Sequence, residues 1–138
     1  GSVRYVDTDP ERVALAEAMG AQAQLVSEWP RRFDRALVVV DNTGTAEGLH
    51  CAIRSTAPYG HLTSVAIQFT PVTSVPLLEM YTRGITVYTS RADYLTQVLS
   101  LVAAGRIDPA PVTSRIVGRD EVAAAWLQPA TKLVVDLR

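Results

Sequence analysis

The sequence predicts an α/β fold in which helices cover a doubly wound, mostly parallel sheet. Strand-like and helix-like segments alternate along the whole chain, and short loops connect them. The run Ala36–Asp41 (ALVVVD) is apolar on both faces, as expected of a strand buried between two layers of helices. No internal repeat or interdomain linker interrupts the pattern, so we expect a single domain over residues 1–138.

The expected strands cover residues 3–6, 24–27, 36–41, 62–67, 85–88 and 132–135. The expected helices cover residues 11–19, 45–56, 75–82, 92–104 and 119–127, whereas 68–74 is a loop and 106–118 is extended. The signals are clearest for the first helix. Asp9 is a good N-cap, Pro10 suits the first helical position, and Gly20 supplies a left-handed end. Residues 85–88 (ITVY) are strongly β-prone.

Composition excludes several classes of function. The chain is 48% hydrophobic and 20% charged, which is enough to bury a core. Its net charge is −1 without any run of like charge, so we expect neither a nucleic-acid nor a membrane surface. No apolar stretch approaches the roughly 20 residues that span a bilayer. The lone Cys51, with only His50 and His61, makes a poor zinc ligand set. We therefore expect a soluble, metal-free, cytoplasmic domain.

Candidate ligand-binding residues follow the strands, because open parallel sheets bind ligands outside the carboxyl ends of their strands. These positions are 7–8, 41–44, 66–68 and 89–91. Asp7 can accept two hydrogen bonds from a ribose 2′,3′-diol and would repel a 2′-phosphate, which favours NAD over NADP. Alternatively, Asp7 belongs to a polar loop or helps Asp9 to cap the next helix. Asp41 is more simply a turn former ahead of Asn42.

The sequence contains no motif that identifies a catalytic residue or a metal site. His50 is expected to be an ordinary helix residue, His61 opens a strand at its amino end, and Cys51 is a small buried apolar residue. No serine lies in a Gly-x-Ser-x-Gly turn, and no histidines, cysteines or carboxylates stand at metal-binding spacing. We therefore expect no catalytic residue and no metal ligand in this chain.

Several segments occur in a characteristic order. They are VDTDPERVALA (6–16) with MGA (19–21), FD (33–34) through VDNTGT (40–45), Arg54 through GHL (60–62), and LVAAGRIDP (101–109) followed by DEVAAAW (120–126) and KLVV (132–135). In this order they resemble the second strand and helix, the FDxVxDxTG segment, the L-x-P-G-G start of the fifth strand and the C-terminal close of the medium-chain, zinc-type alcohol dehydrogenase superfamily. The resemblance covers residues 3–138 and implies a Rossmann-like fold.

The resemblance implies a set of cofactor-binding residues, namely Asp7, Arg12, Thr43, Gly44, Val65, Ala66, Ile67, Ser90, Arg91 and Lys132. It implies that Asp7, helped by Arg12, grips the adenosine ribose, and that the turn at 43–44 lies beside the adenosine half. The backbone of 65–67 would meet the nicotinamide carboxamide, and the loop at 90–91 would face the nicotinamide half. Lys132 would pair with the pyrophosphate; its simpler interpretation is a solvated charge at a strand end.

The resemblance also implies missing parts. The family's first strand and glycine-rich turn would precede Val3, and its zinc-binding catalytic domain has no counterpart here. The chain is thus expected to be the cofactor-binding fragment of an NAD(P)-dependent alcohol or polyol dehydrogenase, with zinc only in the missing domain. We expect the isolated fragment to bind NAD weakly or not at all and to be inactive. Alternatives are a non-catalytic dimerisation module and an S-adenosylmethionine-binding, methyltransferase-like domain.

The missing first strand would be central, because the family's strand order is 3-2-1-4-5-6. Its loss is expected to leave the backbone groups of Val3–Val6 and Leu37–Val40 without partners, at a cost of about 1–3 kcal/mol for each buried group. Either the second strand slides against the fourth or another chain supplies the pairing. The resemblance also implies that the strand Ile85–Tyr88 forms a sheet edge that pairs across a twofold axis, so we expect a homodimer.

Overall fold

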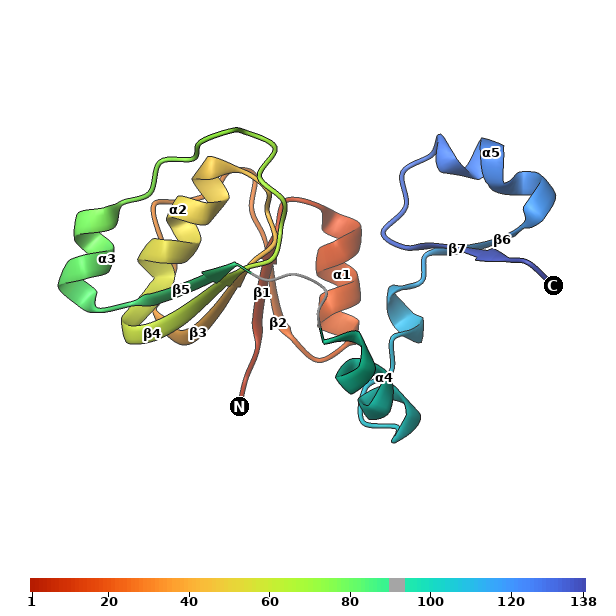
Figure 1. Ribbon diagram of the computed structural model, residues 1–138, viewed down its shortest axis with the longest axis horizontal. Coiled ribbons are helices and arrows are strands. Elements are labelled where there is room, and N and C mark those ends of the chain that lie inside the picture. The colour runs from red at the N-terminus through yellow and green to blue at the C-terminus, as the bar shows by residue number, and fades with distance from the viewer. Residues whose placement is uncertain (90–93) are drawn as a thin grey trace. The chain divides into compact units, whose positions relative to one another are not determined.

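The computed structural model describes residues 1–89 and 94–138 (Figure 1). The chain divides into two compact units, one made of Gly1–Val26 with Tyr94–Arg138 and the other of the residues between them. Every strand pairing in the described residues is parallel, and a helix connects the two strands of each pair along the chain. The predicted α/β class with parallel strands is therefore confirmed.

The unit between Val26 and Tyr94 contains a three-stranded sheet in the order β3 (Ala36–Asp41), β4 (Thr56–Ser64) and β5 (Thr86–Thr89). Helix α2 (Ala46–Ser55) joins β3 to β4 and lies over the sheet, and α3 (Leu77–Arg83) leads into β5 (Figure 1). The core consists of the buried side chains Leu49, Ile53 and Leu62, against which Val39, Ala52, Met80, Ile85 and Val87 pack. Because β3 and β4 are parallel neighbours, their carboxyl ends lie together at the same end of the sheet.

Strand β4 differs from the predicted strand at 62–67 at both ends. It starts directly after α2, because Gly60 allows the segment to lie against β3: a Cβ there would stand 2.8 Å from the Leu37 carbonyl oxygen. The close approach accompanies a register shift in the β3–β4 ladder between Ala36 and Val38. The strand ends at Ser64, the partner of Asp41, because β3 ends there and offers no further pairing. Residues 65–67 therefore follow the strand.

Arg83 stabilises the junction between α2 and β4. Its guanidinium donates to the carbonyl oxygens of Thr56 at 2.7 Å and Ile53 at 3.3 Å, where α2 ends. The last carbonyl groups of a helix have no partner within the helix, so a side-chain donor there satisfies them. Glu79, on the same helix as Arg83, binds Arg54 of α2 at 2.9 Å and keeps α3 beside α2.

The other unit begins with the parallel pair β1 (Arg4–Asp7) and β2 (Gln22–Leu25), connected by α1 (Pro10–Ala18). The predicted cap is confirmed, since Asp9 Oδ1 accepts hydrogen bonds from the backbone N–H groups of residues 11 and 12. Gly20 has φ +89° and follows the helix in the left-handed conformation, as predicted. Strand β2 starts two residues earlier than the predicted 24–27.

The same unit contains the C-terminal elements. Helix α4 (Leu95–Ala103) is followed by a 3₁₀ turn at Ala110–Val112 inside the segment predicted to be extended. Strands β6 (Arg115–Gly118) and β7 (Leu133–Asp136) form a parallel pair joined by α5 (Val122–Trp126). The predicted helix at 119–127 begins with a 3₁₀ turn at Arg119–Glu121, because Glu121 folds back to accept the Gly118 N–H at 3.1 Å.

Strands β1 and β3 are among the strands that keep one open edge within the described residues. Strand β3 pairs only with β4, and β1 pairs only with β2. These are the two strands that the sequence predicted to lack a neighbour. On β3, Leu37, Val38 and Val40 are 66%, 72% and 62% exposed. Strand β3 thus has the apolar composition of a strand covered on both faces, but within the described residues Val39 is its side chain that packs against the core cluster.

Candidate functional site

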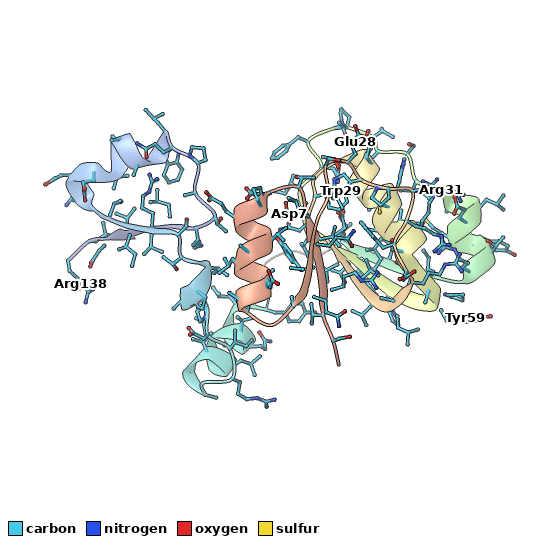
Figure 2. The ribbon with its side chains drawn as sticks, turned by 180° about the vertical axis from the view of Figure 1, so that it is seen from behind. Asp7, Glu28, Trp29, Arg31, Tyr59 and Arg138 are labelled. Carbon is cyan, nitrogen blue, oxygen red and sulfur yellow. The ribbon has the colours of Figure 1, made fainter. Side chains whose placement is uncertain are left out.

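Asp7 forms the centre of a polar cluster at the carboxyl end of β1, where α1 begins (Figure 2). Its Oδ1 accepts the backbone N–H of Asp9 at 3.0 Å and Arg12 Nη2 at 2.8 Å. Its Oδ2 accepts the Tyr5 hydroxyl at 2.7 Å and Arg12 Nε at 2.9 Å. The carboxylate therefore receives four hydrogen bonds, two of them from the parallel donors of one guanidinium.

The local sequence explains why these groups meet. Side chains alternate between the two faces of a strand, so Tyr5 and Asp7 project from the same face of β1. Asp9 caps α1, which turns the chain sharply and directs the Asp9 N–H back to Asp7. Arg12 lies in the first turns of α1, within reach of the strand end. The pair predicted from the resemblance, Asp7 and Arg12, is thus brought together directly.

The hydrogen bonds set the charge state of the cluster. Burial of the Asp7 carboxylate acts to raise its pKa, but hydrogen bonds from Arg12, Tyr5 and Asp9 outweigh burial and lower this pKa to about 2. Burial and the hydrogen bond to Asp7 raise the pKa of Tyr5 to about 12. The hydrogen bond to Asp7 also raises the pKa of Arg12. Asp7 is therefore an anion and Tyr5 a neutral donor over the whole physiological range.

A mostly apolar pocket of about 420 Å³ adjoins the cluster. Tyr5 and Arg12 belong to its wall together with Val3, Leu15, Ala16, Met19, Gly20, Ala21, Val112 and Thr131. The volume falls within the roughly 300–1,000 Å³ typical of small-molecule sites. Tyr5 and Arg12 bond to Asp7 and so connect this pocket with the polar cluster.

A second polar cluster lies at the carboxyl ends of β3 and β4. Asp41, only 2% exposed, accepts the Thr43 N–H at 3.1 Å, the Thr43 hydroxyl at 2.7 Å and the Ser64 hydroxyl at 3.1 Å. The Asp41 carbonyl accepts the Val65 N–H at 2.9 Å. Asp41 therefore ties the turn after β3 to the end of β4, in line with its prediction as a turn former.

The turn at Thr43–Gly44 meets the segment after β4. Gly44 has φ +68°, and a Cβ there would stand 3.7 Å from the Ile67 carbonyl oxygen and 3.8 Å from Ala66 Cβ. The structure thus brings together five of the predicted positions in this unit, and residues 65–67 lie in the loop rather than in the strand. Val65 and Ile67 are 40% and 69% exposed.

The remaining predicted residues lie elsewhere. Ser90 and Arg91 fall outside the described residues. Lys132 precedes β7, and its backbone exchanges hydrogen bonds with Ser114. His50 Nε2 lies 2.7 Å from the Ser74 carbonyl oxygen, and His61 stacks on Tyr88. Both histidines therefore have contacts of an ordinary structural kind.

Sequence reasoning missed two residues of these clusters. Tyr5 was assigned only to a strand, although its position two residues before Asp7 places it on the same face. Ser64 was assigned to the middle of a strand, and no sequence signal pairs it with Asp41, because they meet only through the register of β3 and β4.

The buried Cys51 lies 3.9 Å from the Ser55 hydroxyl, and burial raises the pKa of its thiol.

No group of three or more potential metal ligands occurs among the described residues. Over the same part of the chain, no helix is long and apolar enough to cross a membrane.

A scan against protein-family models and a search of curated proteins give no match. Solved structures do match. Alcohol dehydrogenase TADH from Thermus sp. ATN1 aligns with a TM-score of 0.83 and 22% identity, over 100% of this chain and 44% of that one. The alcohol dehydrogenase RspB from E. coli CFT073, solved with NADH, aligns with a TM-score of 0.82 and 18% identity, over 99% and 44%. The chain has the fold of these dehydrogenases.

A third matching structure was solved with a different cofactor. A protein of Sinorhizobium meliloti 1021 classed as a zinc-binding dehydrogenase, solved with NADP, aligns with a TM-score of 0.76 and 21% identity, over 97% of this chain and 44% of that one. The chain thus spans less than half the length of the dehydrogenases that it matches. Because the alignment covers nearly the whole chain, the Rossmann-like dehydrogenase fold accounts for both units and for the order of their elements.

Proposed function

We propose that this chain is the nucleotide-binding part of an NAD(P)-dependent, zinc-type alcohol or polyol dehydrogenase. The single observation that carries the proposal is the Asp7 cluster, an ionised carboxylate at the carboxyl end of β1 in a dehydrogenase fold. Parallel sheets of this kind bind dinucleotides at that end of their strands, with an acidic side chain on the adenosine ribose. The residues fit such a ligand, since two adjacent ribose hydroxyl groups can replace the two Arg12 donors on the Asp7 carboxylate.

Within this proposal, the residues named above take the binding roles that the resemblance implies. Asp7 and Arg12 hold the adenosine ribose, and the Thr43–Gly44 turn lies beside the adenosine half. The backbone of residues 65–67, whose Val65 N–H already bonds to the Asp41 carbonyl, would meet the carboxamide, and Lys132 would supply a positive charge for the pyrophosphate. When bound, NAD(P) supplies the hydride chemistry, and the protein orients it. The chain's own part is therefore binding and orientation, and the reaction of the whole enzyme needs further groups.

Nucleotide titrations test this function. We expect the isolated chain to bind NADH weakly, with a dissociation constant on the order of millimolar, and to show saturable quenching of tryptophan fluorescence. Asp7→Ala should abolish the saturable signal, whereas Asp108→Ala, at a position that bonds only to its own loop, should not. Thermal shifts with NAD, NADP and S-adenosylmethionine side by side separate the candidates. Stabilisation by S-adenosylmethionine alone would contradict the proposal and indicate a methyltransferase-like domain.

We also propose that the chain forms a homodimer in the cytoplasm. Leu77, Leu78 and Tyr81 of α3 and Tyr88 of the edge strand β5 are 55–82% exposed. Apolar patches of this kind mark interaction surfaces, and an edge strand can pair with a second copy. The free, buried Cys51 agrees with a reducing compartment. A monomer mass by light scattering at micromolar concentration would contradict the dimer.

The same surface favours a second candidate function, a module that only dimerises. This module would fold cooperatively and associate, but no nucleotide would change its melting temperature. The thermal-shift series therefore distinguishes it from the dehydrogenase part, because association without any nucleotide effect supports the module and a shift with NAD or NADP supports the dehydrogenase.

A further inference from the structure

Three guanidinium groups converge on one carboxylate near the amino ends of β3 and β4. Glu79 of α3 accepts a hydrogen bond from Arg54 Nε at 2.9 Å, and Arg31 Nη2 lies 3.7 Å from the same oxygen (Figure 2). Arg83 Nη2 lies 3.9 Å from the other oxygen. Arg31 precedes β3, Arg54 lies in the last turn of α2, and Arg83 ends α3. These four side chains form what we call the arginine cluster.

The charges of the arginine cluster do not balance. Glu79 supplies one negative charge against three positive charges. Arg35, next to Asp34 in the same loop, adds a fourth positive charge nearby. Burial lowers the pKa of Arg83, and repulsion from Arg35 and Arg54 lowers it further, although Glu79 acts in the opposite direction. A positive potential therefore remains after the charge of Glu79 has been counted.

Two of the three guanidinium groups have unused donors. Arg83 is fully engaged, because it donates to backbone carbonyl groups where α2 ends and to one in its own helix. Arg54 bonds to Glu79 through Nε, and within the described residues its Nη1 and Nη2 donate no hydrogen bond. The distance of 3.7 Å from Arg31 to Glu79 is too long for a hydrogen bond, and the Arg31 side chain is 74% exposed. Unused donors of two neighbouring guanidinium groups thus lie around one carboxylate.

From this arrangement we propose that the arginine cluster binds a phosphate-type oxyanion, which bridges Arg31 and Arg54 beside Glu79. Phosphate oxygens pair bidentately with guanidinium donors, and a dianion brings two negative charges to a place where the carboxylate brings one. The cluster lies at the opposite end of the strands from Asp41 and Ser64, so the proposal does not rest on the nucleotide-binding function. A free phosphate ion and the phosphate group of a small ester share this chemistry.

Glu79 leaves room for such an anion but opposes it electrostatically. Its side chain is 36% exposed, and one of its three ion-pair contacts is within hydrogen-bond distance. A phosphate can use the Nη groups of Arg54 while Nε stays on Glu79, and it can bond to Arg31 without breaking any hydrogen bond of that residue to Glu79. The hydrogen bond from Arg54 lowers the pKa of Glu79, so this carboxylate is ionised and repels the ligand. Neutralising Glu79 should therefore tighten binding, which a purely structural role of the cluster does not predict.

Titration of the full chain with inorganic phosphate at about pH 8, where phosphate is mainly a dianion, tests the site. Binding is followed by the NMR signals of the backbone and of the arginine Nε–H groups. Sodium chloride at the same ionic strength is the control for general screening. We expect saturable shifts at residues 31–35, 54 and 79–84, with a dissociation constant on the order of a few millimolar. Methyl phosphate distinguishes the two sources, because similar affinity indicates a site open to esters and loss of binding indicates a site for the free ion.

Two exposed arginines of one loop provide a matched pair of variants. Arg31→Ala should weaken phosphate binding at least about fivefold. Arg32→Ala removes the same charge from a side chain that bonds to the Phe33 carbonyl, and it should weaken binding less than about twofold. Glu79→Gln keeps an acceptor oxygen for Arg54 but removes the repelling charge, so it should tighten phosphate binding about tenfold.

The proposal is overturned if the two arginine variants lose affinity equally, or if phosphate shifts the signals no more than chloride does. It is also overturned if the saturable shifts are confined to Asp7, the turn at residues 43–44 or Lys132. That last result would place the phosphate at the candidate nucleotide site and leave the proposed function intact. If Glu79→Gln does not fold, the matched pair decides, because neither exposed arginine holds the core.

Discussion

Replacement of Gly48 by alanine tests how tightly the turn after β3 is packed. Gly48 lies in the first turn of α2, where its N–H donates to the Thr45 hydroxyl at 3.1 Å. A Cβ at this position would stand 2.5 Å from both Cβ and Cγ2 of Thr43, and nearer still to its Oγ1. Helix propensity alone predicts that Gly48→Ala stabilises the protein by about 1 kcal/mol, whereas packing against Thr43 predicts the opposite sign.

The structure indicates that packing prevails. Thr43 cannot accommodate the methyl group without moving, and its N–H and hydroxyl are two of the donors to the buried Asp41. Overpacking costs about 1–3 kcal/mol, and weakening one hydrogen bond to a charged group costs about 1.5–3 kcal/mol. After the helical gain of about 1 kcal/mol is subtracted, we expect a net loss of about 1.5–5 kcal/mol, and a melting temperature lower by roughly 5–20 °C.

Urea unfolding followed by far-ultraviolet circular dichroism measures this change. The Gly48→Ala substitution is made in the original chain and in a Thr43→Gly background, which removes all three crowding atoms. In that background the alanine should be neutral or stabilising by up to about 1 kcal/mol. Gly118→Ala is the control, because its Cβ would come no nearer than 3.6 Å to Glu121. A neutral or stabilising effect of Gly48→Ala in the original chain would refute the packing argument.

Further predictions concern single side chains. Folding lowers the pKa of Asp7 from 3.8 to about 2, so its ionisation stabilises the folded state above about pH 4, and this stabilisation is lost as the pH falls toward 2. Asp7→Asn should therefore remove about 1 kcal/mol of the pH dependence of the free energy of unfolding, measured in acid titrations. This value is discounted because solvent partly screens the ion pair with Arg12. Arg83→Met leaves the Thr56 carbonyl without its 2.7 Å donor and should cost about 1–3 kcal/mol in urea unfolding, more than Arg83→Lys. Ile53→Ala, at a fully buried position, should cost about 2–5 kcal/mol, whereas a loss below 1 kcal/mol would contradict the assigned core.

Much of the secondary structure could be predicted because its signals are local. The cap at Asp9, the proline that follows it and the glycine at position 20 act within a few residues of each other, and α1 forms where they indicate. The limits of β4 were not predictable in the same way. Pro58 and Gly60 are typical of a loop, yet they lie in a strand because the backbone of β3 approaches Gly60 closely. Such an approach is a property of two strands, which a single segment does not reveal.

The candidate site shows the same division. The order of acidic and glycine-containing turns after the strands predicted which positions gather at the strand ends, and Thr43, Gly44, Ala66 and Ile67 do meet. That Asp7 is already saturated by Arg12 and Tyr5 could not be predicted, because it depends on the rotamer of a long side chain and on the turn that carries it. The sequence places an acidic side chain at this strand end, but it does not reveal which donors already fill the Asp7 carboxylate.

From its amino acids alone, this protein was assigned a parallel α/β architecture and a rim of polar residues after the strands, because hydrophobic pattern, caps and turn formers are properties of short stretches. Only the folded chain decided where β4 begins and ends, which donors fill the Asp7 carboxylate, and that Asp41 joins Ser64. Those features depend on atoms distant in sequence, and their positions follow from strand register and side-chain packing, which no local pattern encodes.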